Sequence, residues 1–196
     1  MKTTRTYTMD ARARSVEETR QRILEAFFEL ALERLFPEIS LDDVAAAADV
    51  SVKTILRHFI SRDQLVDAAI AYGVSRVGSE LEEPVGDVDA AIRAITDHNE
   101  RRGDASLRML AQEFSHPQVQ KLTALGRDLH RQWVRRVFGP FLDGDDNLFR
   151  LLVVATDVYT WRILRRDMNL SRASTERHLR QLISALLAHA PNGAAS

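Results

Sequence analysis

The chain has 196 residues, and 45% of them are hydrophobic, so it is long and apolar enough for one large or two small domains and is not generally disordered. It contains no cysteine, which excludes disulfides, cysteine nucleophiles and cysteine-ligated metals. Its net charge of −1 gives no general indication of a nucleic-acid partner. The chain has no secretory signal and no apolar run near the roughly 20 residues of a membrane span, so we expect a cytoplasmic protein without a membrane partner.

The first predicted helix begins near residue 16. Ile23, Phe27 and Leu30 recur at helical spacing, and Ser15 followed three residues later by an acid is typical of a capping box. Pro37 ends this helix, because proline disfavours helical geometry at the residue before it. Residues 1–15 are expected to form a flexible basic arm. A solvated tail is the favoured interpretation of this arm, and contact with DNA is the alternative.

Three further helix starts follow closely, each marked by a serine that can cap it: Ser40, Ser51 and Ser61. The second and third helices, over about 41–48 and 52–58, are joined by a tight link. This arrangement predicts a helix-turn-helix module. Its third helix would enter a major groove about 12 Å wide, so its outer face cannot be acidic. Residues 50–62 meet this demand, because they contain cations and no acid.

The residues of this segment divide into a core set and an outward set. The apolar residues that can form the small core are Val44, Ala45, Ala48, Val50, Ile55 and Phe59. The outward set can read a groove, because lysine and arginine donate to guanine or phosphate and methyl groups contact thymine. Its members are Ser51, Val52, Lys53, Thr54 and Arg57.

In this order of residues the chain resembles the tetracycline-repressor (TetR) family of bacterial transcription regulators. The similarity covers roughly residues 16–66 and rests on Ser40-Leu41, Val44-Ala45, Ala48, Val50-Ser51, Ile55, His58-Phe59, Ser61-Arg62-Asp63 and Leu65. The resemblance implies that Ser40, His58 and Arg62 contact phosphates and that the outward set faces the groove.

Two departures from the family pattern stand in this segment. Asp49 replaces the usual glycine of the turn, and aspartate tolerates left-handed geometry, so the turn can survive. Leu56 replaces a tyrosine whose hydroxyl in relatives resembles a phosphate contact, so that contact is missing here.

The remainder of the chain also shows helical periodicity, which predicts an all-α fold of about nine helices. After a long fourth helix from about residue 62, helices are expected near 88–101, 104–115, 117–138, 146–167 and 172–189, with a loop at 139–146. The predicted domains are a helix-turn-helix DNA-binding domain at 16–66 and a ligand-binding and dimerisation domain at 67–190, followed by a disordered tail at 191–196.

The resemblance implies two functions for the second domain. The last two helices would form a homodimer interface, with candidates Leu151, Val158, Leu179, Leu182, Ile183 and Leu186. The middle helices would bind a small-molecule effector of unknown identity. The candidate pocket residues combine apolar and polar groups, as ligand pockets do: His98, Met109, Phe114, Leu125, Leu129, Trp133 and Tyr159.

No spacing typical of an enzyme or a metal site occurs. The histidines form neither H-x-x-x-H nor H-E-x-x-H, and G-x-S-x-G, Walker and G-x-G-x-x-G motifs are missing. We therefore expect no catalysis, no cofactor and no metal. The sequence predicts a ligand-responsive, homodimeric repressor that binds a palindromic double-stranded DNA operator. The alternative is a helical small-molecule-binding or interaction protein that does not bind DNA.

Overall fold

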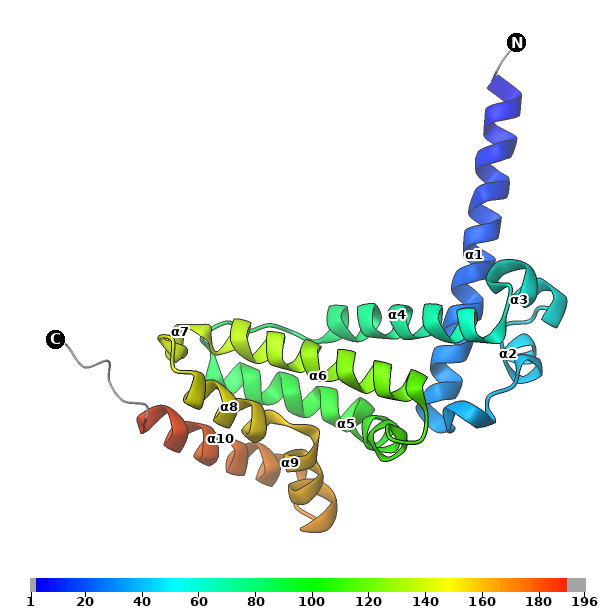
Figure 1. Cartoon of the computed structure of the whole chain (residues 1–196). Coiled ribbons are helices and arrows are strands. Elements are labelled where there is room, and N and C mark those ends of the chain that lie inside the picture. The colour runs from blue at the N-terminus through cyan, green and yellow to red at the C-terminus, as the bar shows by residue number, and fades with distance from the viewer. Residues whose placement is uncertain (1–2, 190–196) are drawn as a thin grey trace. The chain divides into compact units, whose positions relative to one another are not determined.

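The computed structural model describes residues 3–189, which form ten α-helices, a 3-10 turn and a π-helical segment, with no strand among them (Figure 1). The predicted all-α class is therefore confirmed, while the predicted tail at 191–196 lies outside the described residues. The elements in chain order are α1 (Thr3–Glu33), η1 (Phe36–Glu38), α2 (Leu41–Ala47), α3 (Val52–Phe59), α4 (Arg62–Glu80), α5 (Val88–Gln112), α6 (Pro117–Val137), α7 (Gly139–Leu142), α8 (Asp146–Thr156), α9 (Val158–Arg162), η2 (Ile163–Asp167) and α10 (Arg172–Ala188).

The chain divides into two compact units within α4, between Ser75 and Arg76. The N-terminal unit contains α1 to α3 and most of α4. Apolar side chains of α1 bind it together: the ring of Phe27 meets that of Phe36 edge-on at 5.5 Å, and Phe28 meets Tyr72 at 6.0 Å. Aromatic pairs prefer this edge-to-face geometry.

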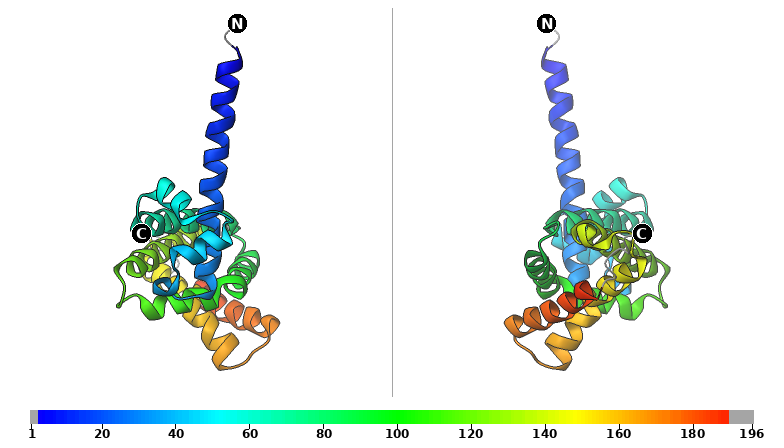
Figure 2. Two further views of the ribbon diagram at one scale, coloured as in Figure 1. Left: turned by 90° about the vertical axis from the view of Figure 1, so that its right-hand side faces the viewer. Right: turned by 90° about the vertical axis from the view of Figure 1, so that its left-hand side faces the viewer.

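Helix α1 is longer than the sequence indicates. It begins at Thr3, not near residue 16, and its N-terminal turns extend beyond α2 and α3 (Figures 1 and 2). The predicted start at Ser15 is wrong because the helix simply continues through it. The Ser15 carbonyl accepts a hydrogen bond from the Thr19 hydroxyl, as a residue inside a helix can.

The C-terminal unit is built around α5, which packs against α6, α9 and α10. Its largest fully buried side chains are aromatic. Trp133 of α6 is completely buried, donates its indole N–H to the Glu82 carbonyl at 2.8 Å, and packs edge-on against Phe138. Apolar side chains of α8 and α10, including Leu152 and Ile183, complete this core.

The predicted break in α5 at Gly103 is wrong, since one helix runs from Val88 to Gln112. The glycine serves helix packing instead of helix termination. A Cβ atom at Gly103 would lie 2.5 Å from the ring of Trp161, so only glycine lets α9 approach α5 this closely. The Trp161 indole N–H then reaches the Glu100 carboxylate at 3.1 Å.

The single helix expected over 146–167 is divided into three elements. Asp157 has extended backbone (ψ 150°), and its carboxylate accepts the Tyr159 N–H at 2.8 Å, so it ends α8 and caps α9. The loop expected over 139–146 also differs, because Gly139–Leu142 form the short helix α7.

Within residues 3–189 no helix is long and apolar enough to cross a lipid bilayer. In the same part of the chain, no three histidine, aspartate or glutamate side chains gather in a way that could hold a metal ion.

Candidate nucleic-acid interface

Side-chain caps fix the starts of α2 and α3, as the sequence predicts. Ser40 and Asp43 form a complete capping box, in which the Ser40 Oγ accepts the Asp43 N–H at 3.1 Å and the Asp43 carboxylate accepts the Ser40 N–H at 2.8 Å. Ser51 Oγ accepts the Thr54 N–H at 3.1 Å. Between the helices Asp49 adopts φ 52°, so the prediction that aspartate would tolerate the left-handed turn is confirmed.

The predicted division of this segment into core and outward residues agrees with the observed burial. Of the six core candidates, Val50 is half-buried and the others are buried. On the outer side of α3, Lys53 and Arg57 are exposed, while Val52 and Thr54 are half-buried. Leu56 is 40% exposed on the same helix. The face that α3 presents to solvent is therefore basic with an apolar component.

The hydroxyl groups at the start of α3 already have partners within the helix. Ser51 Oγ and Thr54 Oγ1 lie 2.9 Å apart, and Ser51 also caps the helix. Their hydrogen-bonding capacity toward another molecule is reduced accordingly. The exposed side chains free of such local bonds are the cations, so Lys53 and Arg57 dominate the chemistry of this face.

His58 is half-buried at the end of α3. Desolvation, followed by repulsion from Arg57 and Arg20, lowers the pKa of its imidazole. Its Nε2 atom is buried and has no hydrogen-bond partner. The isolated chain therefore presents a neutral imidazole at this position at pH 7.

Two residues that the resemblance assigns to phosphate binding have partners inside the unit. Arg62 donates from Nη2 to the carbonyls of Phe36 and Ile39 at 2.9 and 3.1 Å, so its guanidinium holds the η1 loop against α4. The Ser40 hydroxyl donates to the Asp43 carboxylate at 2.6 Å. Arg34 of α1 pairs with the same carboxylate at 3.0 Å.

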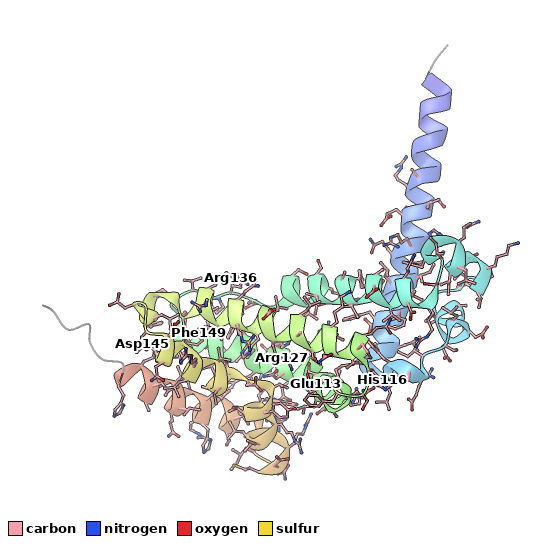
Figure 3. All side chains as sticks on the ribbon, in the orientation of Figure 1. Glu113, His116, Arg127, Arg136, Asp145 and Phe149 are labelled. Atoms are coloured by element: carbon pink, nitrogen blue, oxygen red, sulfur yellow. The ribbon has the colours of Figure 1, made fainter. Side chains whose placement is uncertain are left out.

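The candidate pocket residues differ widely in burial. Met109 and Trp133 are buried in the C-terminal unit, and His98 and Leu129 are half-buried there. Phe114 is 90% exposed, and Leu125 and Tyr159 also lie at the surface. Near Phe114, Arg127 of α6 donates to the Glu113 carboxylate at 2.7 Å, which ties the end of α5 to α6 (Figure 3).

His98 of α5 and His130 of α6 bring polar groups into the C-terminal unit. Burial, with smaller contributions from Arg102 and Arg101, lowers the pKa of His98 to about 4. Burial also lowers the pKa of His130. His130 Nε2 lies 2.9 Å from the Thr156 hydroxyl, which itself donates to the Leu152 carbonyl at 2.8 Å, so Nε2 of His130 is the donor. Both imidazoles are neutral at pH 7.

The candidate dimerisation residues fall into two layers. Leu151 of α8 and Leu182 of α10 are exposed, at 41% and 42%, and Val158 and Leu186 are half-buried. Leu179 and Ile183 are buried within the protomer. Both residues pack in the hydrophobic core of the unit.

Sequence reasoning missed the long-range arginine contacts. The Arg20 guanidinium lies over the Phe59 ring at 4.6 Å and so connects α1 to the end of α3. Around η1, Arg34 donates to the Glu38 carbonyl, and Arg62 donates to the carbonyls of Phe36 and Ile39. An arginine in an amphipathic pattern carries no sequence signal for the carbonyl that it will reach, so none of these contacts was predictable.

Comparisons with known proteins agree with the helix-turn-helix geometry. Residues 23–69 match the family model described as bacterial regulatory proteins, tetR family. Two curated relatives are each 34% identical: an uncharacterized HTH-type transcriptional regulator, YvkB, from Bacillus subtilis over 70 residues, and the HTH-type transcriptional repressor KstR from Rhodococcus jostii over 77 residues. The matched parts are 36% and 39% of this chain, and they span 37% and 36% of those relatives.

The fold extends the likeness to most of the chain. A transcriptional regulator from Rhodococcus sp. Rha1 superposes with a TM-score of 0.64, and the match covers 86% of this chain and 96% of that one at 19% identity. This likeness is one of fold. The match at residues 23–69 makes this part of the chain similar to the tetR family of bacterial regulatory proteins, and the helix-turn-helix arrangement of α2 and α3 agrees with that similarity.

Proposed function

We propose that this protein is a ligand-responsive transcriptional repressor that binds a palindromic operator as a homodimer, with α3 in the major groove. The basic outward face of α3 carries the proposal: Lys53 and Arg57 are exposed, one helical turn apart, on a helix that starts at a side-chain cap. KstR, which is 34% identical over 77 residues, is described as a repressor, which supports the same direction of regulation here.

Selection of random DNA duplexes on the purified chain tests DNA binding. Recovery of a palindrome with half-sites about one helical turn apart, or a multiple of that, is the expected result. Lys53→Ala should weaken binding to the selected duplex at least several-fold, because it removes an exposed groove-facing cation. Lys121→Ala removes a cation from α6 and is the matched control, with affinity expected to stay unchanged. No enrichment at low salt would favour a binding protein that does not recognise DNA.

Homodimerisation is supported by the exposed apolar residues of α8 and α10, including Leu151, Val154 and Leu182. Exposed apolar side chains on neighbouring helices that pack together, as α8 and α10 do, are typical of an interface. Leu182→Asp should produce a monomer at micromolar concentration in sedimentation velocity. Val85→Asp replaces a residue that is 60% exposed in the α4–α5 loop and should remain dimeric. A wild-type monomer would contradict this part of the proposal.

The effector is proposed to bind between the middle helices of the C-terminal unit, near His98 and His130. Neutral imidazoles beside buried apolar side chains give the mixture of polar and apolar groups that small-molecule sites use. An effector acts by binding one arrangement of the dimer better than another. The difference between its two binding free energies sets how far it can shift the equilibrium between them. Exposure to a library of small molecules should reveal compounds that release the selected duplex, and His130→Phe should alter their potency without changing DNA affinity.

A further inference from the structure

Two exposed apolar side chains end the DNA-facing helix, and the fold of the protomer accounts for neither. Leu56 is 40% exposed and Ile60 is 75% exposed. The Ile60 N–H donates to the Leu56 carbonyl at 2.9 Å, which places Ile60 one helical turn after Leu56. We call these two residues the apolar edge of α3.

Ile60 is also in a backbone conformation that its side chain disfavours. It has φ 61° and ψ −45° at the C-cap of α3, a region that glycine enters freely and a β-branched residue does not. Burial does not offset this strain, because three quarters of the side chain is exposed. A strained and exposed isoleucine is therefore better explained by a contact outside the protomer than by folding.

The charges around the apolar edge indicate which partner covers it. Lys53, three residues before Leu56, and Arg57, three residues before Ile60, are both exposed and share a helix face with these apolar residues, so cations flank the edge. Residues 50–62 contain no acid. A polyanion with apolar groups in its grooves fits this surface, and in the major groove of DNA the thymine C5-methyl is the apolar group that a side chain can reach.

We infer that the apolar edge reads thymine: Leu56 and Ile60 pack against thymine C5-methyl groups of the operator, and the chain uses Leu56 for base preference where relatives have a tyrosine. This inference rests on the proposed function of α3. Leu56 is therefore expected to contribute sequence preference, as base contacts do. It should not contribute salt-dependent affinity, because an apolar side chain releases no counterions from the phosphates.

Uracil substitution tests the inference directly, because uracil lacks only the C5-methyl. Each thymine of a half-site of the selected duplex is replaced in turn, and Kd is measured for the wild type, Leu56→Ala and Lys53→Ala. At one or two positions the wild type should bind about fourfold more weakly, the effect of one lost methyl contact. Leu56→Ala should bind the thymine duplex more weakly and be insensitive to uracil at those positions. Lys53→Ala should remain sensitive, which controls for general weakening.

Ile60 gives a second, independent measurement. Ile60→Gly relieves the backbone conformation, so the midpoint of unfolding should rise while affinity for the selected duplex falls several-fold and its salt dependence stays the same. Uracil effects that are equal in wild type and Leu56→Ala, together with wild-type affinity of Ile60→Gly, would overturn the inference. That result would leave the proposed function standing, whereas failure to select any duplex would remove the proposed function itself.

Discussion

The two units of the chain use their cations in different ways. On α3, Lys53 and Arg57 are exposed and take part in no ion pair with the residues that the structure describes. In the C-terminal unit, arginines join helices through carboxylates: Arg102 reaches Glu80 at 2.5 Å, and Arg165 reaches Glu100 at 2.5 Å. Positive charge is thus available to a ligand on α3, whereas these two arginines of the C-terminal unit are neutralised by carboxylates of their own unit, although the net charge of the chain is only −1.

Net charge therefore says little about nucleic-acid binding unless the pairing of each cation is known. Interhelical pairs such as Arg172 with Asp97 (2.7 Å) and Arg180 with Asp89 (2.5 Å) fix α10 to α5. They are partly exposed, so each contributes little stability alone and mainly selects the helix arrangement. We therefore expect the C-terminal unit to depend on contacts between helices that are distant in sequence, and the N-terminal unit to depend more on local helix caps.

Gly103→Ala should give the largest effect, by breaking the approach of α9 to α5. The added Cβ would meet the Trp161 ring at 2.5 Å, so the unfolding free energy should fall by about 2–3 kcal/mol in urea denaturation. Gly126→Ala in α6 is the matched control. Nothing lies within 4 Å of a Cβ there, so its higher helix propensity should stabilise the chain by up to about 1 kcal/mol. Equal effects of the two substitutions would contradict the packing role of Gly103.

Acid should weaken the C-terminal unit through His98. The ordinary pKa of 6.5 applies to the unfolded chain, and burial lowers it to about 4 in the folded one. Below pH 6.5 the unfolded state therefore binds a proton that the folded state does not, and stability falls as the pH falls. The contribution is about 2 kcal/mol between pH 7 and pH 5.

The measurement compares urea denaturation of the wild type and His98→Gln at both pH values. Other groups that face His98, namely Glu80, Arg101, Arg102 and His130, remain in both proteins. The variant should lose less stability on acidification than the wild type. An identical pH dependence would show that His98 does not titrate across this range.

Arg62→Lys tests whether the N-terminal unit depends on one long-range contact despite its local caps. Lysine retains the charge but cannot serve both the Phe36 and Ile39 carbonyls with a rigid guanidinium. The unfolding free energy should fall by about 1–2 kcal/mol, with an unchanged salt dependence of DNA affinity. Arg57→Lys alters an exposed arginine without such partners and should leave stability unchanged. Full stability of Arg62→Lys would restore phosphate binding as the better explanation of this residue.

The same contrast explains how much of the structure could be predicted from sequence. The starts of α2 and α3 were predictable because Ser40 and Ser51 cap the helices that they precede, and local spacing carries that information. The continuity of α5 was not, because Gly103 is explained only by Trp161, which lies 58 positions later in the chain. The basic face of α3 was predictable, whereas the internal partners of Arg62 depend on how α4 meets η1.

The smallest effects concern two buried threonines of the C-terminal unit that differ in one respect. Thr175 of α10 is fully buried and its hydroxyl has no partner, while the Thr156 hydroxyl bonds both His130 and the Leu152 carbonyl. Thr175→Val replaces an unsatisfied hydroxyl with a methyl and should stabilise the chain by up to about 1 kcal/mol. Thr156→Val removes the partner of His130 Nε2 and should destabilise the chain by about 1 kcal/mol. Thermal unfolding at pH 7 measures the change in stability of each variant relative to the wild type, which should be positive for Thr175→Val and negative for Thr156→Val. If both substitutions destabilise the chain equally, the Thr175 hydroxyl has a hydrogen-bond partner in solution.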